Sequence, residues 1–464
     1  MDEALPTSVS DLAGMKVAII SGGLQDVRYD KVLGNSLLRL NTAPEVLAAC
    51  ETGVADYCLM DSVHFIGTHA QEKGASYCFS DTLGGNVGVA FNKASSDLCE
   101  SYNAWLRQAK QDGIHADMID RWTKADVEIT EMPDLGKEPS GTPLRIGITT
   151  DFPFAYVKNN HWAGLEIEMA RRWGLSIGRP VEFTLFDLGA VIAALETNKV
   201  DAVCAFMYIT AERSKRVLFS DPYYSSHTVC FRHMGQTQKA VPLFSWSGIK
   251  ESFHNNIIVE DRWKLIVDGL YETVYISFFA VLLGTLVGAL ICWMRMSRSR
   301  LLSQTARTFI DLVRGIPVLV ILMVLFYIVF ASSFLQARWV AIIAFAINFG
   351  SYVSEMFRTG ISGVDRGQTE AALALGFTKT QAFFRYIVPQ ALKKILPVYK
   401  GEVISIIKST SVVGYIAIQD LTKVSDIIRS RTFDAFFPLI IISVVYFLLT
   451  WLIGKIIDSV EVKI

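Results

Sequence analysis

The chain has 464 residues, of which 51% are hydrophobic and 19% are charged, whereas roughly 25% of the residues in an average soluble domain are charged. This apolar balance predicts a membrane protein. The formal net charge of −1 excludes the strongly basic surface on which nucleic-acid-binding proteins rely.

The N-terminal half alternates β-rich runs with helical stretches. After a tail of residues 1–11, the range 12–131 contains the runs MKVAII, APEVLAACETGVADYCLM and NVGVAFNK, followed by a long helical stretch. A linker containing proline and glycine, MPDLGKEPSGTP at 132–143, separates it from a second block at 144–233 that begins LRIGITTDFPF. This alternation predicts an α/β fold for both blocks.

From residue 234 onward the pattern changes. The range 234–263 is predicted to be a linker that ends in an amphipathic approach to a membrane, and 264–464 to be an all-α transmembrane domain. Uncharged runs of about 20 residues are long enough to span a bilayer. Five spans are expected: Val274–Trp293, Gly315–Ala337, Trp339 to about Ser354, a weaker one within Val403–Gln419 that Lys408 interrupts, and Ala435–Gly454.

The segment between the third and fourth predicted spans contains strong local signals for helix starts and ends. Residues 370–397 read EAALALGFTKTQAFFRYIVPQALKKILP, which predicts two short helices broken at Gly376. Thr378 and Gln381 are spaced as an N-cap and its reciprocal partner, and Pro389 is expected to end the second helix. The result is a helical hairpin between membrane spans.

This stretch resembles the EAA coupling loop of ABC importer permeases of the polar amino acid family. The resemblance extends into FGSYVSEMFRTGISGVDRGQ (349–368) before it and KGEVISIIKSTSVVG (400–414) after it. Tyr386 and Val388 depart from the usual aliphatic residues but remain apolar. The resemblance implies that the loop at 369–397 docks into a separate cytoplasmic ATPase, with these coupling residues: Glu370, Ala371, Gly376 and Pro389. An amphipathic hairpin without a partner is the alternative.

The N-terminal half resembles a periplasmic amino acid-binding protein with its two lobes in permuted order. The run ITAERSKRVLFSDPYY in the second block is typical of lobe 1, and DLAGMKVAIISGG in the first block resembles the start of lobe 2. The resemblance implies one bilobed domain of type II: lobe 2 and the closing helices of lobe 1 at 12–131, and lobe 1 at 144–233. Two truncated tandem domains are the alternative, but each would leave open sheet edges.

The binding-protein resemblance also implies a ligand site. An amino acid held in a closed cleft needs a cation for its carboxylate and an anion for its ammonium group. The matching positions are Arg213 in ITAER and Asp61 in DYCLMD; the alternatives are a surface charge for Arg213 and a helix N-cap for Asp61. The other matching positions are Phe152, where the family places an aromatic ring, and Tyr208, Gly23 and Leu188, which depart from the residues usual there.

The sequence lacks the common nucleotide-binding and catalytic motifs. The sequence contains no GxxxxGK[ST], HExxH or GxSxG, so we predict no catalytic residue, cofactor or metal, and ATP hydrolysis is expected from the partner subunit. The seven cysteines show no CxxC spacing; most are expected to be small buried groups, and any disulfide pairing stays open. Residues 1–15 contain acidic residues and no apolar stretch, so they do not resemble a signal peptide.

The expected protein is therefore a substrate-binding and permease fusion subunit of an ABC importer, in the bacterial inner membrane, working as a dimer of permease domains. Basic residues predict its orientation, with the coupling loop inside and the binding domain outside. They follow the first span (Arg295, Arg298, Arg300 and Arg307) and lie in the coupling loop (Lys379, Arg385, Lys393 and Lys394). Lys423, Arg429 and Arg431 lie on the predicted outer side, against this rule. An amino acid-gated channel and a sensor built on the same domain are the alternatives.

Three further predictions concern residues in the expected spans. Glu355 and Arg358 are expected to pair at the inner end of the third span. Gly284 and Gly288 form a GxxxG pattern, which allows two helices to approach closely. Lys408 is an ionisable group within a span, either functional or extended to the membrane interface.

Overall fold

The computed structural model describes residues 5–67, 75–123, 130–233, 246–331 and 335–461. The expected tail at 1–11, linker at 234–263 and span at Gly315–Ala337 therefore lie partly outside the described residues. The chain divides into two compact units. The first comprises Met1–Leu265 and Val424–Leu439, and the second Ile266–Lys423 and Ile440–Ile464.

The first unit contains two lobes, and lobe A is built on a five-stranded sheet with the order β2-β1-β3-β12-β4. Its strands and helices are these: β1 (Val17–Ile20), α1 (Leu24–Leu33), β2 (Leu37–Leu40), α2 (Ala43–Glu51), β3 (Tyr57–Asp61), α3 (Ser62–Gly67), β4 (Ala75–Val87) and β12 (Tyr224–His233). Strands β1, β2 and β3 are parallel, whereas β12 runs antiparallel to β3 and to β4. Short 3-10 turns lie at Val9–Leu12 and Gly34–Ser36.

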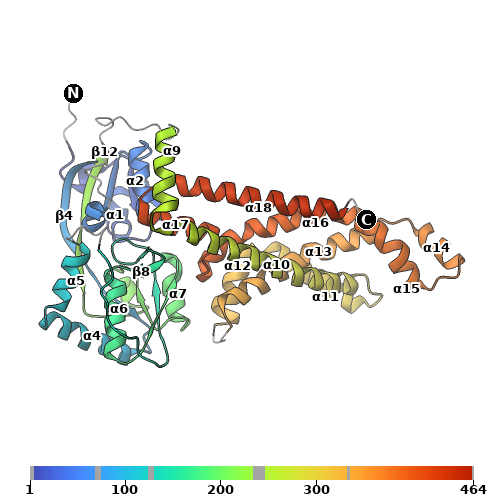
Figure 1. Ribbon diagram of the computed structural model, residues 1–464, viewed down its shortest axis with the longest axis horizontal. Helices are drawn as coiled ribbons and strands as arrows, with labels where there is room; N and C mark the ends of the chain where they lie inside the picture. Colours follow the sequence, from blue (N-terminus) through green and yellow to red (C-terminus); the bar gives the residue numbers. More distant parts are fainter. Residues whose placement is uncertain (1–4, 68–74, 124–129, 234–245, 332–334, 462–464) are drawn as a thin grey trace. The chain divides into compact units, whose positions relative to one another are not determined.

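Lobe B is built on a second five-stranded sheet with the order β11-β5-β10-β6-β9. Its strands and helices are these: β5 (Ala90–Phe91), α4 (Ser96–Gln111), α5 (Ile114–Thr123), β6 (Leu144–Ile148), α6 (Leu165–Ser176), β9 (Val181–Leu185), α7 (Leu188–Glu196), β10 (Ala202–Cys204), α8 (Ala211–Ser214) and β11 (Leu218–Phe219). A small hairpin of β7 (Tyr156–Lys158) and β8 (His161–Ala163) joins it. Figure 1 shows α4, α5 and α6 beside this sheet.

The two sheets have the same plan, and each is completed by a strand from the other half of the chain. In both, three parallel strands are followed by two antiparallel neighbours. Strand β5 follows the strands of lobe A in sequence but pairs in lobe B, and β12 follows the strands of lobe B but pairs in lobe A. The range 144–233 thus supplies strands to both sheets, so neither half of the chain can complete its sheet alone.

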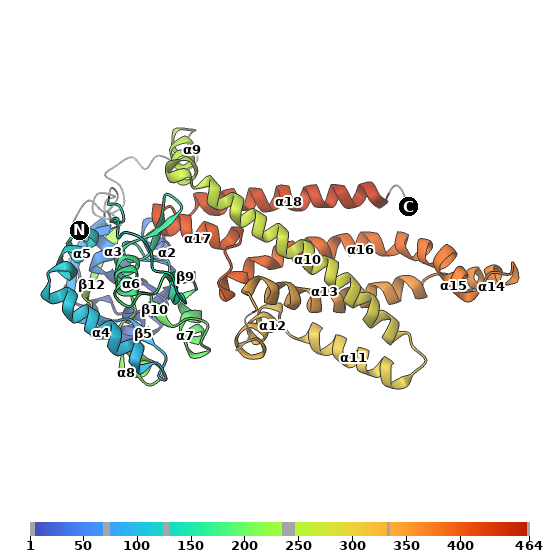
Figure 2. The same ribbon diagram turned by 60° about the horizontal axis from the view of Figure 1, so that its bottom comes forward.

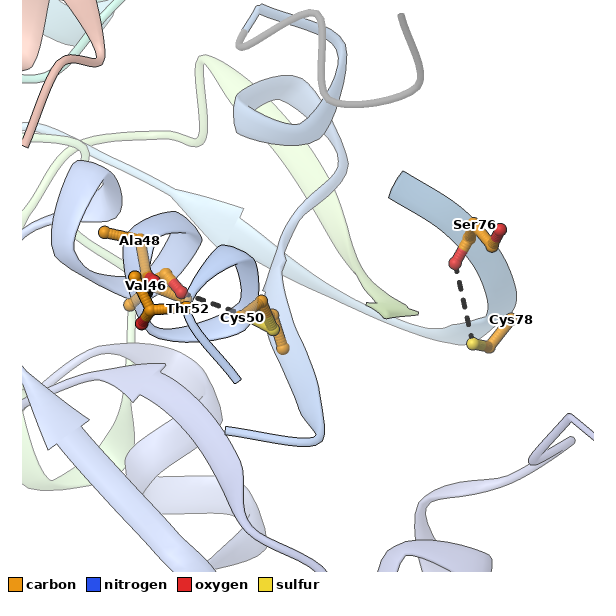
Figure 3. Close-up of a disulfide and its surroundings, with 7 residues drawn as sticks. Val46, Ala48, Cys50, Thr52, Ser76 and Cys78 are labelled. Atoms are coloured by element: carbon orange, nitrogen blue, oxygen red, sulfur yellow. Dashed lines mark hydrogen bonds between the residues drawn. A yellow bond between two sulfur atoms is a disulfide. The ribbon is translucent and has the colours of Figure 1, made fainter. Parts of the chain in front are cut away.

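Alternating residues fill the two faces of the lobe A sheet. Val17 and Ile19 of β1 pack into one cluster, and Ala18 between them packs into the cluster on the opposite face. This alternation, with both faces buried, is expected of strands covered by helices on each side. Cys50 at the end of α2 and Cys58 in β3 form a disulfide, a pairing that the sequence alone left open (Figure 3).

The first unit also includes the end of a late helix, α17 (Leu421–Thr432). Arg429 lies 3.0 Å from the carboxylate of Glu45 on α2, and Arg431 lies 2.8 Å from that of Glu260. These two arginines are buried, and each is held in an ion pair within the first unit. Helix α9 (Trp246–Phe253) and the turns His254–Ile258 and Val259–Asp261 complete this unit.

The second unit is helical. It is made of α10 (Trp263–Arg295), α11 (Arg300–Gly315), α12 (Val318–Val324), a π-turn (Leu325–Val329), α13 (Ala337–Ser362), α14 (Arg366–Ala374), α15 (Lys379–Ala382), a π-turn (Phe383–Ile387), α16 (Val388–Ser409), a 3-10 stretch (Thr410–Ile416) and α18 (Phe437–Glu461). Figure 2 shows α13 and α16 running side by side, with α14 and α15 beyond their ends.

Three described helices, α10, α13 and α18, are long and apolar enough to cross a membrane, and the number rises to five if each of two bent pairs is one span. Of the bent pairs, Arg300–Gly315 with Val318–Val329 turns by 103°, and Lys379–Ile416 with Leu421–Thr432 turns by 54°. The stretch around Arg300 and Arg307, which was expected to lie between the first and second spans, is instead the first half of a bent pair. Pro317 accounts for the sharper bend, because proline disfavours helical geometry in the residue before it.

The GxxxG pattern marks a close crossing of α10 and α13. A Cβ atom on Gly284 would lie 2.9 Å from the carbonyl oxygen of Ala346, and one on Gly288 would lie 2.9 Å from that of Gly350. The two backbones can approach this far only because these positions lack side chains. The expected pair of Glu355 and Arg358 is confirmed at 2.7 Å, at the hairpin end of α13.

Candidate functional site

Loops at the carboxyl ends of parallel strands bring the candidate ligand-binding residues together. Asp61 ends β3, and Gly23 follows β1; Asp151 follows β6, and Tyr208 follows β10. Ligands of open α/β sheets bind at such strand ends, because the loops there converge. The two lobes face each other with these loops, and polar groups from one lobe reach the other.

Asp61 is a buried carboxylate that the opposite lobe contacts. The hydroxyl of Tyr208, in lobe B, donates a hydrogen bond to its Oδ1, and Nδ1 of His64 lies 3.7 Å from its Oδ2. Burial raises the pKa of Asp61, while the charge of His64 and the hydrogen bond from Tyr208 act in the opposite direction. A buried carboxylate with a raised pKa favours a positively charged neighbour or ligand.

His64 forms the second link between the lobes. Its Nε2 lies 2.5 Å from Oδ1 of Asp151, which belongs to lobe B. Burial alone would lower the pKa of His64, but the charge and hydrogen bond of Asp151, with Asp61 behind them, raise it to about 8. Because the imidazole is held between two carboxylates, it carries a positive charge at neutral pH.

Arg213 forms the third link. Its Nη2 donates to the carbonyl oxygen of Gly22 in lobe A at 2.8 Å, and its Nη1 to the carbonyl oxygen of Tyr208 at 3.2 Å. Burial lowers the pKa of Arg213, although guanidinium stays charged at any ordinary pH. Both acceptors are neutral carbonyl groups, so the positive charge is held in the cleft by dipoles, in a position where a carboxylate would be a stronger partner.

Aromatic rings line the same region. The ring of Phe206 lies 4.2 Å from that of Phe154, 5.3 Å from His64 and 5.4 Å from Tyr208, measured between centroids. Tyr224 packs 5.4 Å from Phe154. These rings exclude water, which strengthens the electrostatic interactions of the charged groups beside them.

Glu166 of α6 holds the loop that carries Phe206. Phe206 has a φ of 43°, a strained value for a bulky residue. Its backbone N–H donates to Oε1 of Glu166 at 2.8 Å, and the Tyr223 hydroxyl donates to the same oxygen. Burial raises the pKa of Glu166 to about 7. This carboxyl group therefore fixes the backbone between β10 and Tyr208.

The structure places the other predicted ligand-binding residues at different distances from Asp61 and Arg213. Gly23 is the N-cap residue of α1, next to the carbonyl that Arg213 binds, and Leu188 begins α7 and is half-buried. Phe152 packs against Tyr156 and Phe433, with Arg431 5.3 Å above its ring. The aromatic ring beside Phe206 and His64 is Phe154, two residues further along the chain.

Sequence reasoning missed His64, Asp151, Phe154, Phe206 and Glu166. A signal existed for two of them: Asp151 and Phe154 belong to the segment TTDFPF directly after β6, the strand-end position where ligands bind. Nothing local marks His64 or Glu166, because each acquires its role only through a partner far away in sequence.

The coupling hairpin forms largely as its sequence predicts. Gly376 adopts a φ of 87° between α14 and α15, a conformation that favours glycine. The Thr378 hydroxyl accepts from the N–H of Gln381 at 3.3 Å, and the Gln381 side chain accepts from the N–H of Thr378 at 3.0 Å. This reciprocal pair is the predicted capping box and is confirmed.

The prediction for Pro389 was wrong. Instead of ending a helix, Pro389 lies in the first turn of α16, which continues to Ser409. Proline is tolerated there because the first N–H groups of a helix have no intrahelical acceptor. The preceding π-turn, Phe383–Ile387, joins α15 to α16 without a break in the helical assignment.

The hairpin combines a packed inner side with an apolar outer side. Ile387, Ala391 and Ile395 pack in one cluster with Val364. Leu375 and Phe384, by contrast, are 75% and 64% exposed, and Glu370 and Ala371 are exposed on α14. The outer side of the hairpin therefore presents exposed apolar side chains together with the exposed residues of α14.

Comparisons with known proteins identify the helical half. Residues 280–461 match the family described as "Binding-protein-dependent transport system inner membrane component". The putative glutamine transport system permease protein of Rickettsia bellii is 34% identical over 204 residues, which is 43% of this chain and 92% of that protein. The chain belongs to this permease family. It is a transport subunit rather than an enzyme, and the family description places its members in the inner membrane.

Other relatives match a similar share of the chain. The probable amino-acid ABC transporter permease protein of Bacillus subtilis is 32% identical over 197 residues, covering 42% of this chain and 87% of that protein. A crystal structure described as an amino acid ABC transporter with histidines is 37% identical, covers 43% of this chain and 94% of that chain, and has a TM-score of 0.41. The coupling hairpin lies within the family match at 280–461, whereas the cleft between the two lobes lies before it.

Proposed function

We propose that this permease carries its own substrate-binding domain and imports an amino acid. The observation that supports a binding domain is the exchange of strands β5 and β12 between two sheets of identical order. A domain built in this way has two lobes with facing loops, joined by crossing strands, and can close around a small ligand. In the proposed organisation, a tail at 1–11 precedes the lobe segments 12–131 and 144–233, and a linker at 132–143 separates them. A second linker at 234–263 leads to the permease domain at 264–464.

The order of the two lobes in the chain is part of this proposal. Lobe A corresponds to lobe 2 of a periplasmic binding protein but comes first, so the domain is circularly permuted, and the linker at 132–143 joins positions that would be the termini of the unpermuted form. Permutation is tolerated where termini are close and exposed. Two tandem truncated domains fit less well, because each sheet needs the strand that the other half supplies.

The ligand is proposed to be an α-amino acid held between Arg213 and Asp61. Arg213 would receive the carboxylate in place of neutral carbonyl groups, and Asp61 would receive the ammonium group. Gly23, Tyr208, Phe152 and Leu188 are the further candidate lining residues. The names of the relatives, which include glutamine transport and amino-acid transport permeases, support this ligand class.

Transport by this subunit requires partners. The hairpin at 369–397 is proposed to dock into a cytoplasmic ABC ATPase through Glu370, Ala371, Gly376 and Pro389, with the exposed side chains of Leu375 and Phe384 as further contacts. Two permease domains would form the translocation path, and the binding domain would lie outside the membrane. A channel or a sensor on the same domain fits less well, because residues 280–461 match a permease family.

The test is uptake by the reconstituted protein. The full chain, placed in liposomes with a partner ABC ATPase, is expected to accumulate one or more labelled amino acids only when ATP is present on the ATPase side. Thermal-shift screening of the same purified chain against the standard amino acids identifies the ligand. ATP-independent flux down a gradient would support the channel instead, and the lack of any amino acid response would contradict the proposed ligand class.

A further inference from the structure

Two further cysteines meet at an irregular point of the lobe A sheet. On β12, Cys230 pairs with Phe79 and Phe231 pairs with Tyr77, so the residue between these two partners, Cys78, has no counterpart of its own. At such a β-bulge, two residues of one strand oppose a single residue of the other. Cys78 and Phe79 of β4 therefore both face Cys230.

The side chains confirm that the two thiols share one face of the sheet. Cys230 is fully buried in the cluster around Ile19 and Leu59, and Cys78 packs against the same cluster. The two side chains are within hydrogen-bonding reach of each other. The sulfur of Cys78 also approaches the carbonyl oxygen of Ser76 at 3.6 Å, as Figure 3 shows.

The same lobe already contains one disulfide, between Cys50 and Cys58. Disulfides persist in oxidising compartments and are rare in reducing ones. The other three cysteines, Cys99, Cys204 and Cys292, belong to lobe B or to the second unit, and the two remaining cysteines of lobe A are the pair at the bulge.

We propose that Cys78 and Cys230 form a second disulfide, which fixes β12 to β4 at the bulge. This disulfide would lie three residues before the end of β12, the strand between β3 and β4. The proposal rests on the proposed orientation, in which this domain folds outside the membrane.

The chemistry is a thiol–disulfide exchange with an oxidant of the disulfide class. The Cys78 thiolate attacks one sulfur of the oxidant and displaces its other sulfur as a thiol. The Cys230 sulfur then attacks the Cys78 sulfur, forms the Cys78–Cys230 bond and releases the second oxidant thiol. The two cysteines lose two electrons and two protons, and one oxidant disulfide becomes two thiols. Cys78 is the suitable first nucleophile because it is partly exposed, and the hydrogen bond from Cys230 together with the charge of Arg232 lowers its pKa.

Differential alkylation of the purified full chain tests this pairing. The unreduced protein is denatured and treated with N-ethylmaleimide, then reduced and treated with iodoacetamide, and the peptides are analysed by mass spectrometry. We expect Cys50, Cys58, Cys78 and Cys230 to carry the second label and Cys99, Cys204 and Cys292 to carry the first. In Cys78→Ser, Cys230 should change to the first label, whereas Cys99→Ser should leave the pair unaffected.

The Cys50–Cys58 bond serves as an internal reference. If that pair carries the second label while Cys78 and Cys230 carry the first, the proposed disulfide is overturned and the orientation is untouched. If all four carry the first label, the orientation fails; the folded protein is then incubated with oxidised glutathione, and the proposal stands only if a peptide linked through Cys78 and Cys230 appears. A peptide linking either cysteine to any other residue also overturns it.

Discussion

The cleft between the lobes and the coupling hairpin are opposite kinds of surface. In the cleft, charged groups such as Asp61, His64 and Arg213 are withdrawn from water and bonded across the two lobes. On the hairpin, apolar side chains such as Leu375 and Phe384 are exposed. Buried charge requires a complementary charge, and exposed apolar surface requires a covering surface. This contrast supports the proposal that the first site takes a small polar ligand and the second another protein.

A substitution at Gly376 is expected to separate the functions of the two sites most clearly. Replacing it with proline fixes φ near −65°, against 87° in the structure, and removes the N–H that donates to Leu373 at 3.0 Å. We expect ATP-driven uptake to fall to background and recruitment of the ATPase to weaken, while the amino acid affinity of the cleft stays unchanged. Uptake in liposomes, co-purification and calorimetry measure the three quantities.

Matched alanine variants control for a general helix effect. Gly376→Ala places a side chain at a positive φ, which costs about 1 kcal/mol, and should reduce uptake. A Cβ atom on Gly401 in α16 would meet nothing within 4 Å, so Gly401→Ala should leave uptake at the wild-type level. Glu370→Lys should resemble Gly376→Pro. Full uptake and normal ATPase recruitment in Gly376→Pro would remove the docking role of the hairpin.

The next largest effect is expected at Arg213, and it should appear in binding. A hydrogen bond to a charged group is worth roughly 1.5–3 kcal/mol, and the ligand carboxylate would also lose its buried counterion. Arg213→Ala should therefore weaken amino acid binding by about 100-fold or more. Arg213→Lys should retain part of the affinity, because it keeps the charge but not the planar fork. Calorimetry on the full chain measures both.

Arg216 is the control for Arg213, because it lies nearby but binds Glu196 at the surface, with the two side chains 55% and 37% exposed. Such exposed pairs contribute little, so Arg216→Ala should leave affinity nearly unchanged. Equal affinity in Arg213→Ala and Arg216→Ala would refute the amino acid pose and leave the transporter assignment resting on the permease half.

Asp61→Asn should have a smaller effect than Arg213→Ala. The amide keeps an oxygen that can accept a hydrogen bond from an ammonium group, but it loses the charge, so we expect binding to weaken by about tenfold. A ligand analogue without its α-amino group should bind wild type and Asp61→Asn alike, yet remain sensitive to Arg213→Ala. If the analogue responds to Asp61→Asn as strongly as the amino acid does, Asp61 does not hold the ammonium group.

The two sites also differ in how well the sequence predicted them. The hairpin depends on signals that lie within a few residues, namely a glycine at a positive φ and a Thr378–Gln381 capping box, and both predictions were correct. Pro389 was misread because the five-residue π-turn before it is too short to show a periodicity in the sequence, so the sequence could not show that the helix continues.

In the cleft, only the residues with a motif were found beforehand. Arg213 and Asp61 belong to strings that resemble a known family, and Tyr208 directly precedes one of these strings. The structure connects all three residues. His64 and Asp151 are 87 residues apart and meet only because the two lobes face each other, so no local pattern could pair them. The same reason hid Glu166, whose role is to hold the backbone of Phe206.

The smallest expected effect concerns His64 and the pH dependence of closure. Its pKa is raised from 6.5 to about 8, so the protonated form is favoured in the folded protein. The stability that this contributes is fully present below about pH 6.5 and is lost as the pH rises through 8. A His64→Gln variant keeps a hydrogen-bonding side chain without the charge. Between pH 6 and pH 9, the melting temperature of the wild type should therefore fall relative to that of the variant.

The difference between the two proteins reports His64 together with Asp61, whose pKa the charge of His64 lowers. The carboxyl group of Glu166, whose pKa is raised to about 7, changes charge in the same range, but it does so in both proteins and cancels in the difference. His115 provides a second control: burial lowers its pKa and it bonds the carbonyl oxygen of Tyr223, so His115→Gln should not reproduce the His64 profile. Parallel pH profiles for wild type and His64→Gln would show that the His64–Asp151 contact does not hold the lobes together.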